Sequence, residues 1–178
     1  LANGGYVVVW TTSGNGEADE IFARIYGADG LATTGEFRLN QYQTSAQDEP
    51  SIAALPDGGF VVAWSSYGQE ETPNTNRTEV YMRRFGPTGA AVSDELRVNE
   101  AIGNYQRSSQ IAVLDDGSFV IVWQGIDSDL NGVFAQLFDV DGDPVAPDGT
   151  PGLSEFRVNM EEFRNQDEPS VAALTGGR

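Results

Sequence analysis

Leu55-Pro56-Asp57-Gly58-Gly59-Phe60-Val61-Val62-Ala63-Trp64 decides the fold, because the chain carries this stretch three times. The other copies are residues 1–10 and 114–123, and a fourth begins at Leu174. Successive copies start 54, 59 and 60 residues apart. This period predicts repeats at residues 1–54, 55–113 and 114–173, with 174–178 as the start of a truncated fourth. The first repeat lacks its first strand.

Each copy has the pattern of a β-hairpin. The pair Asp57-Gly58 tolerates positive φ at both central positions of a tight turn, as do its counterparts Asn3-Gly4 and Asp116-Gly117. One strand is expected to end near the leucine and another to start at the aromatic residue. The run at 60–64 is continuously apolar rather than alternating, which is typical of a strand covered on both faces.

All three tryptophans occupy the same repeat position, at the end of this apolar run. We expect them to anchor the core where one repeat packs on the next, because large buried aromatic residues dominate core energetics. Stacking against a ligand is the alternative role. Aromatic residues of the following strand are expected in the same core. The predicted core anchors are Trp10, Trp64, Trp123, Phe22, Phe85 and Phe138.

The rest of each repeat supplies further strands. A third strand is expected at 21–26, 80–85 and 133–138, and an edge strand of alternating charged and apolar residues at 36–40, 95–99 and 155–159. In that edge strand, the arginines Arg38, Arg97 and Arg157 are expected to pair with the glutamate two positions earlier. Small residues at 53, 54, 112, 172 and 173 indicate a strand in a crowded place, nearest a central axis.

Four antiparallel strands per repeat match a β-propeller blade. We therefore predict an all-β fold, a β-propeller-like array of three four-stranded antiparallel blades that belongs to a larger ring. Three blades are too few to close, since propellers have about four to eight. Further blades of the same polypeptide or a second copy would supply the rest. A β-solenoid or tandem β-sandwich units are the alternatives.

Composition restricts the function. The 27 acidic and 10 basic residues give a net charge of −17, which repels nucleic-acid phosphates and anionic membrane surfaces. We expect neither nucleic-acid binding nor membrane insertion. The chain has no cysteine and no histidine, which excludes disulfides, thiol nucleophiles and Ser-His-Asp triads. A metal here would be bound by oxygen atoms, and calcium is the first candidate.

One turn has the spacing of a calcium site. Asp139, Asp141 and Asp143 alternate across a glycine, so their carboxylates could converge on one hard cation. A plain turn is the alternative. Asp127 and Asp129 form a weaker candidate. Three loop aromatics are candidates for ligand binding: Tyr42, Tyr67 and Tyr105.

Paired carboxylates could cleave glycosides. The pairs Asp48-Glu49 and Asp167-Glu168 are the candidates, and they recur with the repeat. A catalytic pair is expected at one place only, so this recurrence argues against an enzyme.

The motifs at 57–64, 80–85 and 95–99 resemble a tandem repeat of very large secreted bacterial surface proteins, the RTX-type adhesins and their relatives. The resemblance covers nearly the whole chain. It implies an extracellular or cell-surface setting and a scaffold or adhesion role. The calcium-binding nonapeptide that accompanies these repeats is absent from the sequence, so the calcium-dependent β-roll does not transfer.

These observations predict a non-enzymatic structural or adhesion module. Cell-surface glycans or other surface proteins are its expected partners. A carbohydrate-binding, lectin-like propeller is the first alternative, and a glycosidase-type propeller enzyme is the second.

Overall fold

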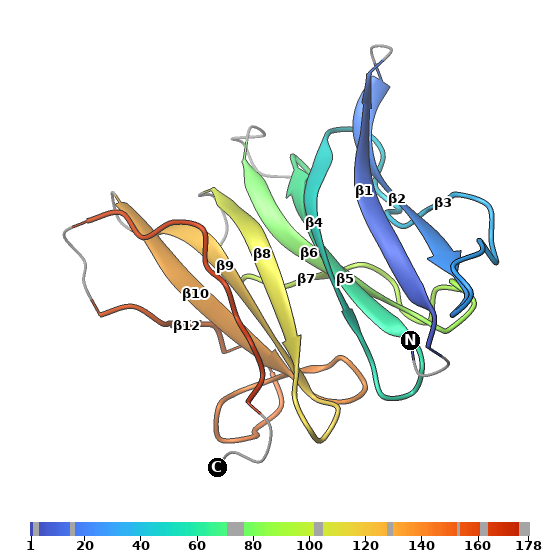
Figure 1. Cartoon of the computed structure of the whole chain (residues 1–178). Coiled ribbons are helices and arrows are strands. Elements are labelled where there is room, and N and C mark those ends of the chain that lie inside the picture. The colour runs from blue at the N-terminus through green and yellow to red at the C-terminus, as the bar shows by residue number, and fades with distance from the viewer. Residues whose placement is uncertain are drawn as a thin grey trace.

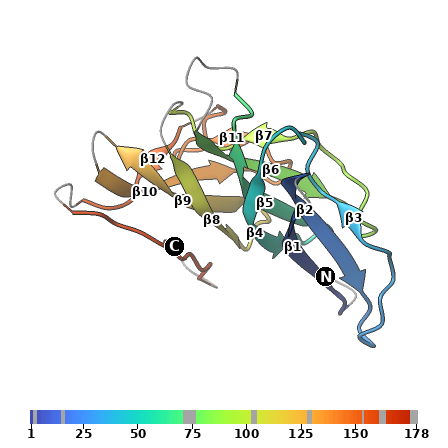
Figure 2. The ribbon, with the colours of Figure 1, turned by 90° about the horizontal axis from the view of Figure 1, so that it is seen from above.

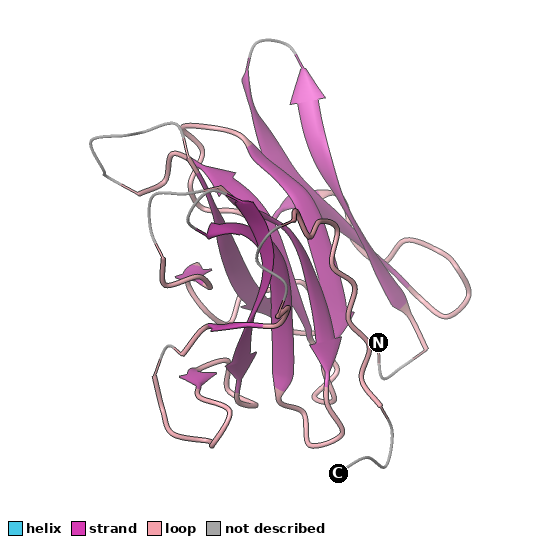
Figure 3. Cartoon of the chain, turned by 90° about the vertical axis from the view of Figure 1, so that its left-hand side faces the viewer, coloured by secondary structure: helices cyan, strands magenta, loops and turns pink. Residues whose placement is uncertain are grey.

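The computed structural model describes residues 1, 4–14, 17–70, 77–101, 105–127, 130–152, 154–160 and 164–174. Within these ranges the regular structure consists of β-strands (Figure 3), and no helix there is long and apolar enough to cross a membrane. The strands are β1 (Tyr6–Gly14), β2 (Glu17–Tyr26), β3 (Phe37–Arg38), β4 (Gln47–Ala54), β5 (Phe60–Tyr67), β6 (Thr78–Phe85), β7 (Leu96–Arg97), β8 (Gln106–Val113), β9 (Phe119–Asp127), β10 (Leu130–Phe138), β11 (Pro144–Val145) and β12 (Phe156–Arg157).

The strands form three antiparallel sheets. The first sheet has the order β1-β2-β3 and the second β4-β5-β6-β7. In the third, β8, β9 and β10 are joined by β11 and β12, which both pair with β10. The sheets follow one another in chain order across the molecule (Figures 1 and 2). The prediction of an all-β fold with antiparallel sheets is confirmed.

The repeated turns join the strands as hairpins. Gly58 has a φ of 87° and donates its N–H to the carbonyl of Leu55, and Gly117 does the same at 89° towards Leu114. These φ values suit glycine, which has no Cβ to clash. The turn sets the register in which Ala54 lies opposite Phe60.

Two cores lie between the sheets, one on each face of β5. Phe60, Val62 and Trp64 pack with the first sheet, whereas Val61 and Ala63 pack with the third. Every side chain of this run is fully buried. The unbroken apolar sequence thus has a direct cause, because the two alternating faces of β5 belong to two different cores.

Each buried tryptophan is fixed by a glutamine of the neighbouring inner strand. The indole Nε1–H of Trp64 donates to Gln47 Oε1 at 2.9 Å, and Trp123 donates to Gln106 Oε1 at 2.8 Å. These bonds satisfy the one polar atom of a fully buried ring. Both Trp64 and Trp123 have 0% exposure.

The first sheet differs from the other two in burial. Trp10 and Phe22 are only half-buried, and Tyr6 of the same strand face is 48% exposed. The structure therefore corrects the expected burial of these two anchors, because none of the sheets formed by the described residues covers this face. Phe85 and Phe138 are buried, at 2% and 0% exposure.

The edge strands are held differently from the sequence expectation. The Glu95 carboxylate does not pair with Arg97 but accepts the backbone N–H groups of Gln41 and Tyr42 in the preceding repeat. Glu155 likewise accepts the N–H of Glu100 at 2.6 Å. Glu95 and Glu155, which have the same repeat position, therefore each link two successive repeats by hydrogen bonds to the backbone.

Candidate active site

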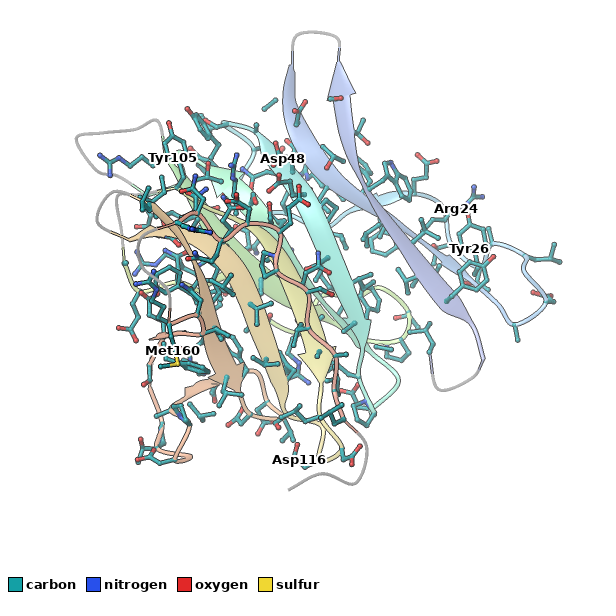
Figure 4. The ribbon with its side chains drawn as sticks, turned by 60° about the vertical axis from the view of Figure 1, so that its left-hand side comes forward. Arg24, Tyr26, Asp48, Tyr105, Asp116 and Met160 are labelled. Atoms are coloured by element: carbon teal, nitrogen blue, oxygen red, sulfur yellow. The ribbon has the colours of Figure 1, made fainter. Side chains whose placement is uncertain are left out.

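The first strands of the second and third sheets, β4 and β8, each have a break in their strand pairing near the start. We call these two strands the inner strands. In β4 the break carries two carboxylates. In β4 the pairing with β5 shifts register between Asp48 and Ser51, and Glu49 has a φ of 51°. In β8 a similar shift places Ser108 at a φ of 55°. Such bulges re-aim side chains, and residues other than glycine adopt positive φ mainly where surroundings enforce it. Asp48 lies at the same end of the sheets as Tyr105, and Asp116 lies at the opposite end (Figure 4).

Asp48 has an environment that favours its protonated form. It is half-buried, and this burial raises the pKa of its carboxyl above the ordinary value, with further contributions from the charges of Glu49 and then Asp19. Asp19 belongs to β2, on the face that carries the buried Ile21 towards the second sheet. Carboxyl groups from two adjacent sheets thus interact at this end of the molecule.

Glu49 has a different role from its neighbour. Its Oε2 accepts the hydroxyl of Ser65 at 3.0 Å and, across the sheet boundary, the backbone N–H of Ser108 at 2.9 Å. The Ser108 hydroxyl lies 3.3 Å from the same oxygen. These contacts fix the Glu49 side chain, whereas burial is the main influence on the neighbouring Asp48 carboxyl and raises its pKa.

The acidic pair Asp48-Glu49 does not recur in every repeat, and its copies have different surroundings. The equivalent positions of the third sheet hold Arg107 and Ser108. In the C-terminal segment, Asp167 accepts a hydrogen bond from the Asn131 side chain at 2.6 Å. The three inner segments therefore have different surroundings, and the sequence objection that a repeated pair cannot be catalytic does not hold for Asp48.

A cleft of about 580 Å³ opens at the upper end of the first sheet, on the face turned away from the second sheet. Glu20, Phe22 and Arg38 contribute to its lining. In the second sheet the equivalent space contains Glu70, which accepts the Tyr81 hydroxyl at 2.5 Å and lies 3.7 Å from the Arg97 guanidinium. Burial, followed by this hydrogen bond, strongly raises the pKa of Tyr81.

The loop tyrosines do not form one platform. Tyr42 is half-buried and donates its hydroxyl to the carbonyl of Gly68 at 2.8 Å, which places it near Tyr67. Tyr105 is 46% exposed, ahead of β8. Their ligand-binding role stays a prediction.

The predicted calcium turn has its own hydrogen bonds. Asp139 Oδ1 accepts the backbone N–H groups of Asp141 at 3.0 Å and Asp143 at 2.9 Å. Across the described ranges there is no group of three or more acidic, histidine or cysteine side chains that could hold a metal ion. Calcium binding at this turn stays a prediction, and the weaker candidate at 127–129 lies outside the described side chains.

Comparison with known proteins gives one informative likeness. No family model and no curated protein matches the chain. The structure is similar to that of an endo-arabinase from Bacteroides thetaiotaomicron VPI-5482, with a TM-score of 0.56 and 14% sequence identity. The match covers 88% of this chain and 59% of the arabinase chain. At this identity the likeness concerns the fold.

This likeness corrects the functional prediction. The similar structure is that of an endo-arabinase, an enzyme, and this finding contradicts the expected non-enzymatic structural or adhesion module. The resemblance to RTX-type repeats, with its extracellular setting, stays a prediction.

Proposed function

We propose that the three sheets are consecutive blades of a β-propeller that cleaves glycosidic bonds, with Asp48 as the proton donor. The observation that carries the proposal is the half-buried Asp48 carboxyl, whose pKa is raised by burial and by the carboxylates of Glu49 and Asp19. Glycosidases need two carboxyl groups held in different protonation states. The fold likeness to an endo-arabinase supports this reaction class.

Each group has a defined task in this proposal. Asp48, protonated, donates its proton to the oxygen of the leaving sugar. The Asp19 carboxyl on the adjacent sheet stabilises the positive charge that develops on the sugar ring or activates a water molecule. Glu49 is a positioning residue: its charge raises the pKa of Asp48, and its bonds to Ser65 and Ser108 hold the bulge.

Polysaccharides of pentose sugars are the proposed substrate class, by analogy with the arabinase. The chain spans 59% of that enzyme's length, and we propose the same reaction class for the part of the fold that it covers. Substrates of this size are met outside the cell, which agrees with the extracellular setting proposed from the sequence.

The test is a reducing-end assay on arabinan and on a panel of other polysaccharides. Wild-type chain should release reducing ends, and Asp48→Asn should lower the rate at least tenfold while the circular dichroism spectrum is unchanged. Asp116→Asn is the matched control, since Asp116 is an exposed aspartate at the opposite end of the sheets (Figure 4). Activity should also fall as the pH rises through the pKa of Asp48, because the acid form is then lost.

Two results would contradict the proposal. One is hydrolysis that Asp48→Asn and Asp116→Asn leave equally intact. The other is saturable binding of a polysaccharide without release of reducing ends, which would support the lectin-like alternative instead.

A further inference from the structure

Arg84 departs from the pattern of its repeat. It follows Val80 and Met82 along the face of β6 that packs towards the third sheet, because side chains two positions apart share a strand face. The equivalent positions of the other two repeats hold Ile25 and Leu137. The Arg84 side chain is only 13% exposed. Burial of a guanidinium is unfavourable where an aliphatic side chain would pack well, so packing does not account for this arginine.

The Arg84 guanidinium is incompletely bonded by the protein. Its Nη1 donates to the carbonyl of Asp141 in the third repeat, and its Nη2 lies 3.5 Å from Asp57 Oδ2. Its Nε is buried and has no hydrogen-bond partner among the described residues. A guanidinium has five N–H groups, so these two contacts leave most of its donors without a protein partner.

A cavity of about 150 Å³ lies beside Arg84, between the turns of the second and third sheets. Its lining includes three apolar and three charged residues: Leu55, Pro56, Val140, Asp57, Arg84 and Asp116. Asp116 lies at the end of the sheets opposite Asp48 (Figure 4), so the cavity is separate from the candidate active site. A cavity of about this volume holds a molecule the size of benzene, which is one six-membered ring.

The turn after β10 holds the arginine in place. Gly142 has a φ of 87°, and a Cβ at this position would lie 2.7 Å from Arg84 Cδ. Only glycine permits this approach without a shift of the arginine. The aliphatic part of Arg84 thus packs against the turn while its Nη1 bonds to the next residue back, Asp141. Because the fold already orders this side chain, binding a ligand there has a lower entropic cost.

The charges around the cavity favour a neutral ligand. The carboxylates of Asp57 and Asp116 line it, and the chain carries a net charge of −17, so an anion is repelled. A cation is repelled by Arg84. A neutral molecule with several hydroxyl groups can instead accept from the guanidinium and donate to a carboxylate.

The remaining groups match a sugar ring. Asp57 Oδ1 accepts the backbone N–H of Gly59 at 2.8 Å, which fixes the carboxylate and leaves Oδ2 to accept from a ligand. Pro56 and Val140 supply an apolar wall against which the C–H groups of a ring can lie. Donors, an acceptor and an apolar wall around one ring-sized space are what a monosaccharide unit requires.

We propose that this cavity binds one neutral sugar residue, which accepts hydrogen bonds from Arg84 and donates a hydroxyl to Asp57. The site is non-catalytic and stands at the opposite end of the sheets from Asp48, so it does not depend on the proposed hydrolysis. Its occupant is either a free monosaccharide or the terminal residue of a glycan, and the two share the same chemistry.

Calorimetric and NMR titrations of the purified chain with free L-arabinose, D-xylose and D-glucose test the proposal. Saturable binding in about the millimolar range is expected, as is a rise in melting temperature with sugar. Methyl glycosides and arabino-oligosaccharides distinguish a chain end from a free sugar. The same titrations in the Asp48→Asn variant show whether binding persists without hydrolysis.

Two variants should each weaken binding at least tenfold: Arg84→Leu, which introduces the residue found at position 137, and Asp57→Asn. Arg24→Leu and Asp29→Asn are the matched controls and should bind as wild type, because neither residue lines the cavity. Arg84→Leu should keep or raise the melting temperature, since an incompletely bonded guanidinium is removed. Loss of binding is then not a result of unfolding.

Three results would overturn the proposal. One is the absence of saturable binding of any of these sugars up to about 100 mM. The second is binding that Arg84→Leu and Asp57→Asn leave unchanged, particularly if Arg84→Leu lowers the melting temperature, which would make Arg84 only a link between two turns. The third is displacement of the sugar by acetate or methylammonium, which would assign the cavity to a charged ligand.

Discussion

Glu49 of the second sheet caps the backbone N–H of Ser108 in the third sheet, at 2.9 Å. Both residues have positive φ, of 51° and 55°, at the same step of two successive inner strands. The contact therefore joins two strained positions, one through its side chain and the other through its backbone. Its loss would leave the Ser108 N–H dependent on water.

We expect Glu49→Ala to lower the free energy of unfolding by about 1 kcal/mol, because a charge-assisted hydrogen bond at an exposed position is lost. Urea titration measures the change. Glu168→Ala is the matched control: Glu168 has the same repeat position and a φ of 52°, so it controls for the cost of alanine at positive φ. Equal losses in the two variants would show that the contact with Ser108 contributes nothing.

The tryptophans should differ in their contribution to stability according to their burial. We expect Trp64→Ala to cost about 3–5 kcal/mol, the range for removing a large buried aromatic residue. Trp10→Ala, at a half-buried position of the same repeat register, should cost clearly less. Both are measured by denaturant titration under monomeric conditions. A Trp64 cost below about 1 kcal/mol would contradict the packing of this core.

Asp48 and Asp116 should respond to pH with opposite signs. The pKa of Asp48 is raised in the folded state, so its favourable contribution exists below the unfolded pKa and is lost as pH rises through the folded value. Asp48→Asn should therefore gain stability relative to wild type at pH 7, and the gain should diminish towards pH 3.

Hydrogen bonds from Ser118 lower the pKa of Asp116, so its contribution exists above the unfolded pKa and is lost as pH falls. Asp116→Asn should therefore lose stability at pH 7 and little near pH 3. Thermal melts of both variants at the two pH values check the signs. The same sign for both variants would mean that the environment of Asp48 is wrongly described.

Variants of the turn at 139–143 would distinguish a hydrogen-bonding role of its aspartates from a metal-binding role. Asp139→Ala should destabilise the chain by about 1 kcal/mol, since two backbone N–H groups lose their acceptor. Asp141→Ala should cost less, because no hydrogen bond to its side chain is found in the described structure. Melting curves in chelator and in millimolar calcium complete the experiment. A rise in melting temperature with calcium that Asp141→Ala removes would establish the calcium site.

The sequence predicted the elements of the repeat well, because they depend on local chemistry. Asp57-Gly58 fixes a tight turn, and the unbroken run after it requires burial on both faces of β5. Contacts between repeats were harder to predict. The bond from Trp64 to Gln47 recurs in Trp123 and Gln106 at the same separation of 17 residues, and this recurrence was the available signal.

The candidate site was only partly predictable. Asp48 and Glu49 were named as a pair, but adjacent residues on a strand say nothing about the partner from another sheet. Asp19 enters the site because the first and second sheets pack at an angle and register that only the tertiary structure defines. The hydrogen bond from the Gln41 backbone N–H to the Glu95 carboxylate could not be predicted for the same reason, since the two residues are 54 positions apart.

The double burial of β5 also determines how the molecule should come apart. Because one strand contributes to both cores, loss of the second sheet would expose the inner faces of the first and third sheets together. Repeat arrays with contacts only between neighbours can unfold piecemeal from their ends. Here β5 belongs to both interfaces between the sheets and couples them. Calorimetry should therefore show a single cooperative transition, in which the whole chain loses its fold when the second sheet does.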